Sequence, residues 1–220
     1  MQISNNKTTA EEALKSLLLR QKITRHRFRM PSTSEEMQLL LTAAYTAEVE
    51  YRGRTYTEDA NVSRAIRTFA DAVTEDTYKC GIMLCGLPGN GKTTLLHAFQ
   101  NAVNLLNSGR AFGKSVGIKI VPSREVTSSY RDYEKFLSIA NQELLGIDDL
   151  GEEPAEILDY GNAVNPMVEL LEKRYDKQLF TIITTNLTPK GLSEKYGQRI
   201  RDRFNEMMRV ITFDNGSFRR

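Results

Sequence analysis

The run Gly86–Thr94 (GLPGNGKTT) constrains the fold of this chain more than any other segment. It fits the pattern G-x-x-x-x-G-K-[ST], in which backbone N–H groups and a lysine surround phosphate groups. An apolar stretch at residues 81–85 precedes it and a helical pattern begins at Thr93, so the order is strand, glycine loop, helix. A glycine-rich turn with a surface lysine would lack this framing. The sequence therefore predicts a nucleotide-phosphate site within an α/β fold.

Each residue type in this phosphate loop suits a separate task. Small glycines let the backbone close around phosphates, and the helix N-terminus adds positive potential. We expect Lys92 to contact the β- and γ-phosphates and the Thr93 hydroxyl to ligate Mg²⁺. The predicted nucleotide-binding residues are Gly86, Pro88, Gly89, Asn90, Gly91, Lys92, Thr93 and Thr94.

Composition narrows the class of protein. The 220 residues are 40% hydrophobic and 26% charged, which suffices for one full core with a small appendage. The net charge of +2 does not by itself demand a nucleic-acid partner. Two cysteines, Cys80 and Cys85, favour buried free thiols over a disulfide, and with two separated histidines they do not predict a zinc site. Without an apolar leader or a membrane-length apolar run, we expect a cytoplasmic chain with no membrane partner.

The chain divides near residue 60. Helices are expected at residues 8–20, from Ser34 onward, and at 61–73, with a basic run between Arg20 and Arg29. We therefore expect a helical, basic N-terminal appendage at residues 1–59 and a nucleotide-binding core at residues 60–220. The appendage either docks a partner protein or is a solvated face with a loosely ordered tail.

Strand and helix patterns alternate after the loop helix, which should end near residues 107–109. This alternation is typical of parallel βαβ units and indicates an α/β class with a mainly parallel sheet. The expected strands are 116–121, 143–147, 179–185 and 209–213, and the expected helices include 124–139 and 162–176.

Polar residues end two of these strands. Asp148 and Asp149 follow one apolar strand, which would place Asp148 beside the Mg²⁺ bound by Thr93 and Asp149 near the attacking water. Asn186 follows the next apolar strand, where an amide can hydrogen-bond both the γ-phosphate and that water. Solvated turn residues are the alternative for all three. Their positions at strand ends downstream of the phosphate loop favour function.

The order of these motifs resembles the AAA+ ATPases of the DnaC/IstB type, over about residues 62–213. The likeness lies in Ile147–Gly151, in the Thr184-Thr185-Asn186 strand end and in the run Tyr196–Arg203 (YGQRIRDR). The resemblance implies a P-loop NTPase (AAA+) three-layer core without a C-terminal helical lid. It also implies ATP as ligand, hydrolysis to ADP and phosphate, and ATP-dependent homo-oligomers. In such proteins an arginine finger reaches a neighbouring subunit's γ-phosphate. In this sequence the resemblance implies that Arg203 is the finger, with Arg199 as the second choice. The alternative is that these arginines form the basic face of a short helix.

The same resemblance suggests the partners. Helicase loaders of this type act on a replicative helicase and single-stranded DNA, and transposition ATPases act with a transposase. Two tyrosines stand among basic residues in the segment 124–135, namely Tyr130 and Tyr133 among Arg124, Arg131 and Lys135. This mixture suits binding of single-stranded DNA. The aromatic residues equally fit a stripe that faces the core.

The leading hypothesis is an AAA+ protein that loads or remodels a replicative helicase on single-stranded DNA. The alternatives are a transposition accessory ATPase, a nucleotide-gated DNA-binding module with negligible hydrolysis, and a small-molecule kinase. The acidic pair and Asn186 favour water over an organic acceptor. Because Asp149 is shorter than glutamate, we expect slow intrinsic hydrolysis.

Overall fold

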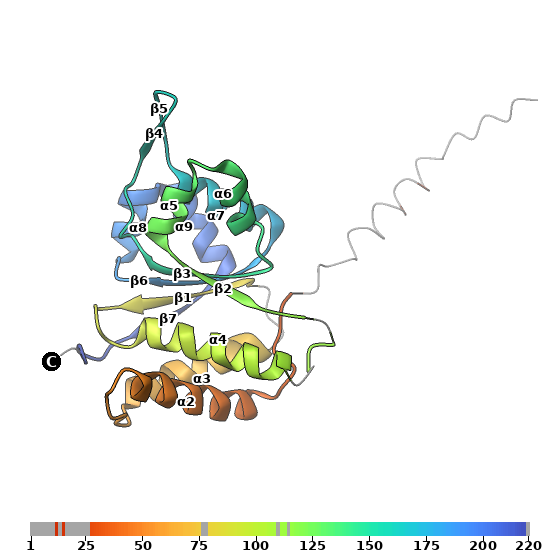
Figure 1. The fold of residues 1–220 in the computed structure, drawn as a ribbon, viewed down its shortest axis with the longest axis vertical. Coiled ribbons are helices and arrows are strands. Elements are labelled where there is room, and N and C mark those ends of the chain that lie inside the picture. Colours follow the sequence, from red (N-terminus) through yellow and green to blue (C-terminus); the bar gives the residue numbers. More distant parts are fainter. Residues whose placement is uncertain are drawn as a thin grey trace, which may run out of the picture.

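A five-stranded sheet separates two helical layers in the computed structural model (Figure 1). The structure describes Glu12, Lys15 and residues 27–75, 79–108, 111–113 and 115–218. Helices α2, α3 and α4 cover one face of the sheet, and α5 to α9 cover the other. The helix expected at residues 8–20 lies outside the described residues except for Glu12 and Lys15, as does the basic run up to His26.

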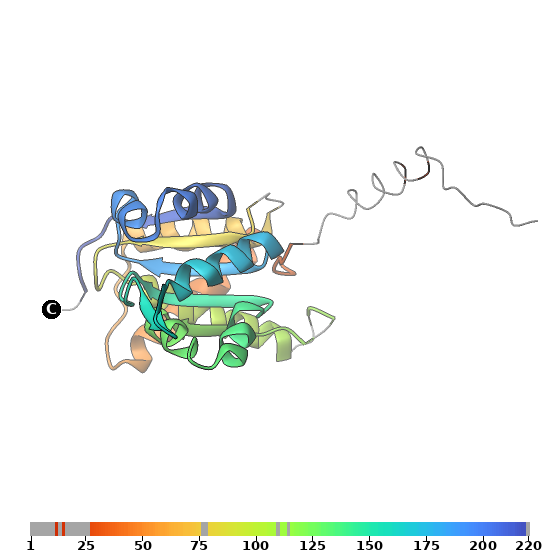
Figure 2. The ribbon, with the colours of Figure 1, turned by 90° about the horizontal axis from the view of Figure 1, so that it is seen from above.

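All neighbouring strands of this sheet are parallel, in the order β2-β3-β6-β1-β7. Figure 2 shows β1, β6 and β3 side by side. Helices cover both faces, which explains why the three inner strands are nearly continuous buried runs, whereas the edge strands β2 and β7 include exposed residues. The predicted α/β, three-layer architecture with a mainly parallel sheet is confirmed. The strands are β1 (Gly81–Gly86), β2 (Ile118–Pro122), β3 (Leu144–Leu150), β6 (Phe180–Thr185) and β7 (Met208–Phe213).

The first helical layer contains α2 (Ser34–Tyr51), α3 (Ala60–Thr74) and α4 (Lys92–Ser108). A capping box begins α2, in which the Thr33 side chain accepts from the Glu36 backbone and the Glu36 side chain accepts from the Thr33 backbone. Met37, Leu41 and Tyr45 of α2 are buried in the same hydrophobic cluster as residues of α3 and α4. This part of the segment 1–59 is therefore a layer of the core.

The second helical layer contains α5 (Ser123–Ser129), α6 (Tyr133–Ala140), α7 (Pro166–Lys177), α8 (Pro189–Tyr196) and α9 (Gln198–Met207). The single helix expected over 124–139 is wrong, because the chain turns between α5 and α6. The Asp132 side chain accepts a hydrogen bond from the Lys135 N–H and caps α6. A capping aspartate can offer the backbone this alternative to a continuous helix.

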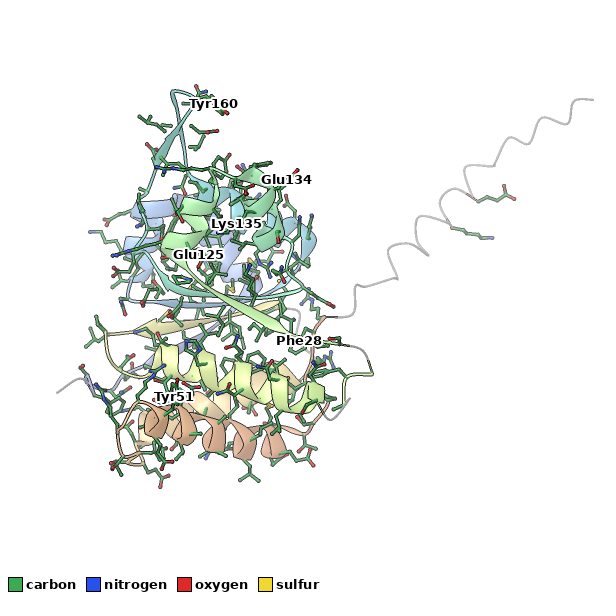
Figure 3. The ribbon with its side chains drawn as sticks, in the orientation of Figure 1. Phe28, Tyr51, Glu125, Glu134, Lys135 and Tyr160 are labelled. Carbon is green, nitrogen blue, oxygen red and sulfur yellow. The ribbon has the colours of Figure 1, made fainter. Side chains whose placement is uncertain are left out.

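The helix expected from Asn162 is also wrong at its start. Residues 157–164 form a hairpin of β4 (Ile157–Asp159) and β5 (Asn162–Val164), and α7 begins only at Pro166, capped by Asn165. Tyr160 and Gly161 both have positive φ, as a tight two-residue hairpin turn requires. The hairpin projects from the body, with Tyr160 fully exposed at its tip (Figure 3).

One charged side chain is fully buried between α7 and the sheet. Arg174 donates hydrogen bonds to the carbonyl oxygens of Ala140, Gln142 and Phe180 and to the Thr181 hydroxyl. Burial lowers the pKa of its guanidinium to about 9, so the group is still charged at neutral pH. Arg174 thus ties the end of α6 to α7 and β6.

Replacing Arg174 with methionine should destabilise the protein by about 3 kcal/mol or more, because several buried acceptors lose their donor at once. Urea unfolding followed by circular dichroism measures the change. Lys173→Met, on the same helix at a partly exposed site, is the control and should cost no more than about 1 kcal/mol. Equal stabilities for the two variants would contradict this role.

Candidate functional site

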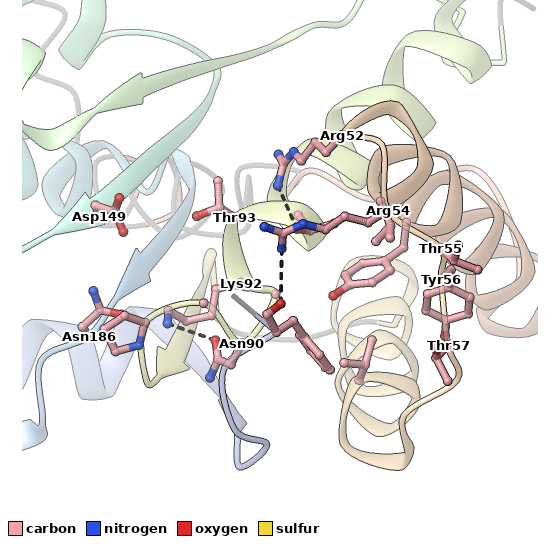
Figure 4. A pocket seen from close by; sticks show the side chains of 18 of the residues that line it. Arg52, Arg54, Thr55, Tyr56, Thr57, Asn90, Lys92, Thr93, Asp149 and Asn186 are labelled. Atoms are coloured by element: carbon pink, nitrogen blue, oxygen red, sulfur yellow. Dashed lines mark hydrogen bonds between the residues drawn. The ribbon is translucent and has the colours of Figure 1, made fainter. Parts of the chain in front are cut away.

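A cavity of about 450 Å³ lies between the phosphate loop, α2 and the ends of β3 and β6 (Figure 4). Open parallel sheets bind ligands at this carboxyl edge. The structure brings most of the predicted site residues together here. The lining includes Pro88, Gly89, Asn90, Gly91, Lys92, Thr93, Thr94, Asp149 and Asn186.

The loop backbone fits the glycine pattern. Gly91 has a φ of 104°, and a Cβ there would lie 2.1 Å from the Tyr45 hydroxyl, so the loop and α2 approach too closely for any side chain. Lys92 is buried, and its Nζ donates to the carbonyl oxygens of Gly86 and Leu87 at 2.8 Å and to Asn90 Oδ1 at 3.1 Å. These bonds hold the ammonium group inside the loop.

Asp148 accepts two hydrogen bonds on one carboxylate oxygen. Thr93 Oγ1 donates to Asp148 Oδ1 at 2.9 Å, and Thr184 Oγ1 donates to the same atom at 2.6 Å. The hydroxyl of α4 and the carboxylate of β3 are therefore adjacent. A hydroxyl and a carboxylate are the hard oxygen donors that Mg²⁺ accepts, so the residues present fit this metal.

Asp149 lies in a break in strand pairing. The register between β3 and β6 shifts between Ile147 and Leu150, and Asp149 has a φ of 54°. Its N–H donates to Thr184 Oγ1 at 2.8 Å, and its carbonyl oxygen accepts from Ser123 Oγ at 2.7 Å. These bonds hold a backbone conformation that costs free energy for a residue with a Cβ. The irregularity places Asp149 in the cavity lining.

Thr184 was not among the predicted site residues. Its hydroxyl donates to Asp148 and accepts from the Asp149 backbone, so one side chain orients both acids. In sequence it stands in the apolar run FTIITT, where threonine is an ordinary strand residue. Only its place one residue before Thr185-Asn186 could have drawn attention to it.

Most of the opposite wall of the cavity comes from the segment 1–59 that was assigned to the appendage. It includes Tyr45 and Val49 of α2, Arg52, Arg54, Thr55, Tyr56 and Thr57 of the following loop, and Val62 of α3. Arg52 Nη1 donates to Thr94 Oγ1 at 3.1 Å. The sequence carried no sign of this wall, because it forms only when α2 packs on α4.

The C-terminal segment also reaches the cavity. The Phe218 N–H donates to the Gly89 carbonyl oxygen at 2.9 Å, and the Phe218 carbonyl oxygen accepts from Arg54 Nη1 at 3.4 Å. Asn215 Nδ2 donates to the Asn90 carbonyl oxygen at 3.0 Å. These bonds attach residues 215–218 to the phosphate loop.

Both candidate finger arginines lie outside the cavity lining, on α9. Arg203 Nη1 lies 2.7 Å from Glu172 Oε1, and its guanidinium covers the Tyr175 ring at 4.9 Å. Arg199 Nε lies 3.5 Å from the same Glu172 oxygen. The Arg203 side chain is 14% exposed and that of Arg199 is 75% exposed. One carboxylate of α7 therefore pairs with both arginines.

The tyrosines considered for DNA contact pack on their own layer. Both hydroxyls donate to Glu169 at 2.8 Å, and Tyr130 packs edge-on against Phe136. The bond to Glu169 is the main reason that the pKa of Tyr130 is raised to about 12. Lys135 is exposed on the same layer, close to Glu134 (Figure 3).

A family model described as "IstB-like ATP binding protein" matches residues 1–220. The chain belongs to this family. No curated protein compared with the chain matches it. No helix in the described part of the chain is long and apolar enough to cross a membrane.

Three solved structures share the fold of this IstB-like chain. The DnaC helicase loader is 21% identical, with a TM-score of 0.56 over 72% of this chain and 93% of its own. DnaI is 22% identical, with a TM-score of 0.53 over 72% and 87%. AMPPCP-bound DnaA from Aquifex aeolicus is 17% identical, with a TM-score of 0.50 over 73% and 49%. These three likenesses concern the fold alone, and the description as an ATP-binding protein is that of the family model.

Thr184→Val removes the hydroxyl that orients both acids while retaining a strand-forming side chain. Turnover of ATP should fall at least about tenfold, since positioning of catalytic groups is a large share of such catalysis. ATP affinity measured without Mg²⁺ should be unchanged. Thr212→Val, at an exposed position of β7, is the control. A Thr184 variant with the turnover of the wild type would show that the hydroxyl has no such role.

Proposed function

We propose that this protein binds ATP in the described cavity and hydrolyses it to ADP and phosphate. The observation that carries the proposal is the hydrogen bonding of Asp148 to Thr93 and Thr184 beside the Lys92 loop. This arrangement joins the phosphate loop to the acidic strand, as hydrolysis of a Mg²⁺-bound nucleotide requires.

Each site residue has a role in this proposal. Thr93 and Asp148 would hold Mg²⁺, which when bound neutralises charge on the phosphates. Lys92 exchanges its loop carbonyls for β- and γ-phosphate oxygens. Asp149 accepts a hydrogen bond from the attacking water, and Asn186 fixes the water and the γ-phosphate by hydrogen bonds.

Arg203 is proposed as a finger that acts on a neighbouring subunit. It is carried by the outer helical layer, away from the cavity of its own chain, and a guanidinium suits the charge spread over phosphoryl oxygens. The ion pair between Arg203 and Glu172 of α7 has to open when Arg203 reaches the neighbouring subunit. Arg199 is the second candidate, and the proposal implies an ATP-dependent homo-oligomer.

Mixing of two inactive variants tests the finger. Arg203→Ala should keep ATP binding but lose turnover on the order of 10³-fold, and Lys92→Ala should lose binding. Because a mixed assembly pairs an intact site with an intact finger, mixing should restore part of the turnover. Arg67→Ala, which changes an exposed arginine of α3, is the control for loss of charge. No recovery on mixing, with assembly demonstrated, would argue against action in trans.

For the client, we propose a replicative helicase on single-stranded DNA in the cytoplasm, with residues before the core docking the partner. The fold shared with the DnaC helicase loader supports this proposal. A transposition accessory ATPase is the second candidate, because the family model is that of IstB-like proteins.

Direct binding to purified candidates distinguishes the two clients. The deletion should end at residue 26, because side chains between Phe28 and Val49 contribute to the core. We expect the full chain with ATP to bind the purified helicase of its own host, and the shortened chain to bind at least about tenfold more weakly. Binding to the cognate transposase instead would establish the second candidate. ATP binding by the wild type with no turnover above that of Lys92→Ala would favour a nucleotide-gated module without hydrolysis.

A further inference from the structure

A buried carboxylate follows the acidic strand and belongs to none of the roles above. The Glu153 side chain has no exposed surface, although it lies in the connection between β3 and the hairpin. Burial of a carboxylate costs free energy unless hydrogen-bond donors or a cation compensate. This carboxylate stands four residues after Asp149 in the sequence.

Three donors surround Glu153. The Gly151 N–H donates to Oε2 at 2.9 Å, the Tyr196 hydroxyl donates to Oε1, and Lys195 Nζ lies 3.4 Å from Oε1. Burial raises the pKa of Tyr196, so its hydroxyl keeps the proton that it donates. Glu153, Lys195 and Tyr196 are called the Glu153 clamp below.

Lys195 also holds the backbone of the turn. Its Nζ donates to the carbonyl oxygen of Gly151 at 2.6 Å and to that of Glu153 at 2.5 Å. The last turn of α8 therefore contacts both ends of the segment 151–153. This segment has no freedom to shift along the sheet edge without breaking several buried hydrogen bonds.

The clamped segment is continuous with the strained residue Asp149. The Glu152 N–H donates to the Asp149 carbonyl oxygen at 3.1 Å. Gly151 has a φ of 110°, and a Cβ there would lie 2.7 Å from a Leu187 methyl group. Two sets of contacts thus support the left-handed conformation of Asp149. Thr184 and Ser123 hydrogen-bond to its own backbone, and the Glu153 clamp holds the segment that follows it.

We propose that the Glu153 clamp is a positioning device that fixes the Asp149 carboxylate in the cavity and connects it to α8. The proposal rests on hydrolysis at this site, the proposed function. Glu153 does not line the cavity and acts through the backbone of Asp149. Because α8 leads into α9 through Gly197, contacts made by α9 with another subunit reach the catalytic acid through the same clamp.

Glu153→Gln tests the clamp with almost no change in volume. The amide has one acceptor oxygen, so it does not accept from Gly151 and Tyr196 on separate atoms and does not pair with Lys195. We expect kcat to fall roughly 10- to 100-fold, the loss that a displacement of about 1 Å produces, with the ATP Kd changed by less than about twofold. Tyr196→Phe removes one donor and should give a smaller fall of the same kind.

Matched controls exist in the same segment. Glu156→Gln and Tyr160→Phe change exposed residues on the connection and hairpin and should leave both constants as in the wild type. Melting temperatures of all variants identify any that fail to fold. Should Glu153→Gln unfold, Tyr196→Phe carries the test. Folded clamp variants with the kcat of their controls, or with a loss confined to Kd, overturn the proposal.

A double-mutant cycle with Asp149→Glu separates positioning from general damage. A longer acid depends less on the exact backbone position, so the fold loss caused by Glu153→Gln should be smaller in the Asp149→Glu background. Equal losses in the two backgrounds would mean that the clamp does not act through Asp149. ATP turnover by the wild type that does not exceed that of Lys92→Ala would instead remove the proposed function itself.

Discussion

The hydrogen bonds of Asp148 to Thr93 and Thr184 are the interaction on which the site depends. In the sheet, β6 lies between the acidic strand β3 and the loop strand β1, so the acids and the phosphate loop are not on neighbouring strands. Thr184 of β6 spans this gap, and Thr93 at the start of α4 completes the contact. Without parallel strands that end at one edge, these three side chains could not meet.

Sequence predicted the parts of the site that depend on local pattern. The phosphate loop, the Asp148-Asp149 pair and Asn186 stand directly after apolar strands, and their strand ends coincide in the fold. Thr184 was not predicted, because a threonine inside a strand has no distinguishing pattern. The wall from Tyr45 to Thr57 was not predicted either, because it depends on packing between helices that are far apart in sequence.

Errors in secondary structure have a common physical cause. Near Asp132 and Asn165, side-chain capping overrides a hydrophobic periodicity that continues across the break. Periodicity predicts which face is buried but not where the backbone leaves the helix. This explains why α5 and α6 were merged and why β5 was taken as the start of a helix. The end of β1 and the start of α4 were predicted to within one residue, and Gly86 and Gly91 with positive φ lie at these two points.

Helix α2 shows why a boundary near residue 60 does not describe the packing. One face of α2 buries Met37 and Leu41 against α3 and α4, and its C-terminal end supplies Tyr45 and Val49 to the cavity. The phosphate loop and α2 therefore line the same cavity from opposite sides. Because the Tyr45 hydroxyl lies against Gly91, a displacement of α2 at this point changes the packing of the phosphate loop directly.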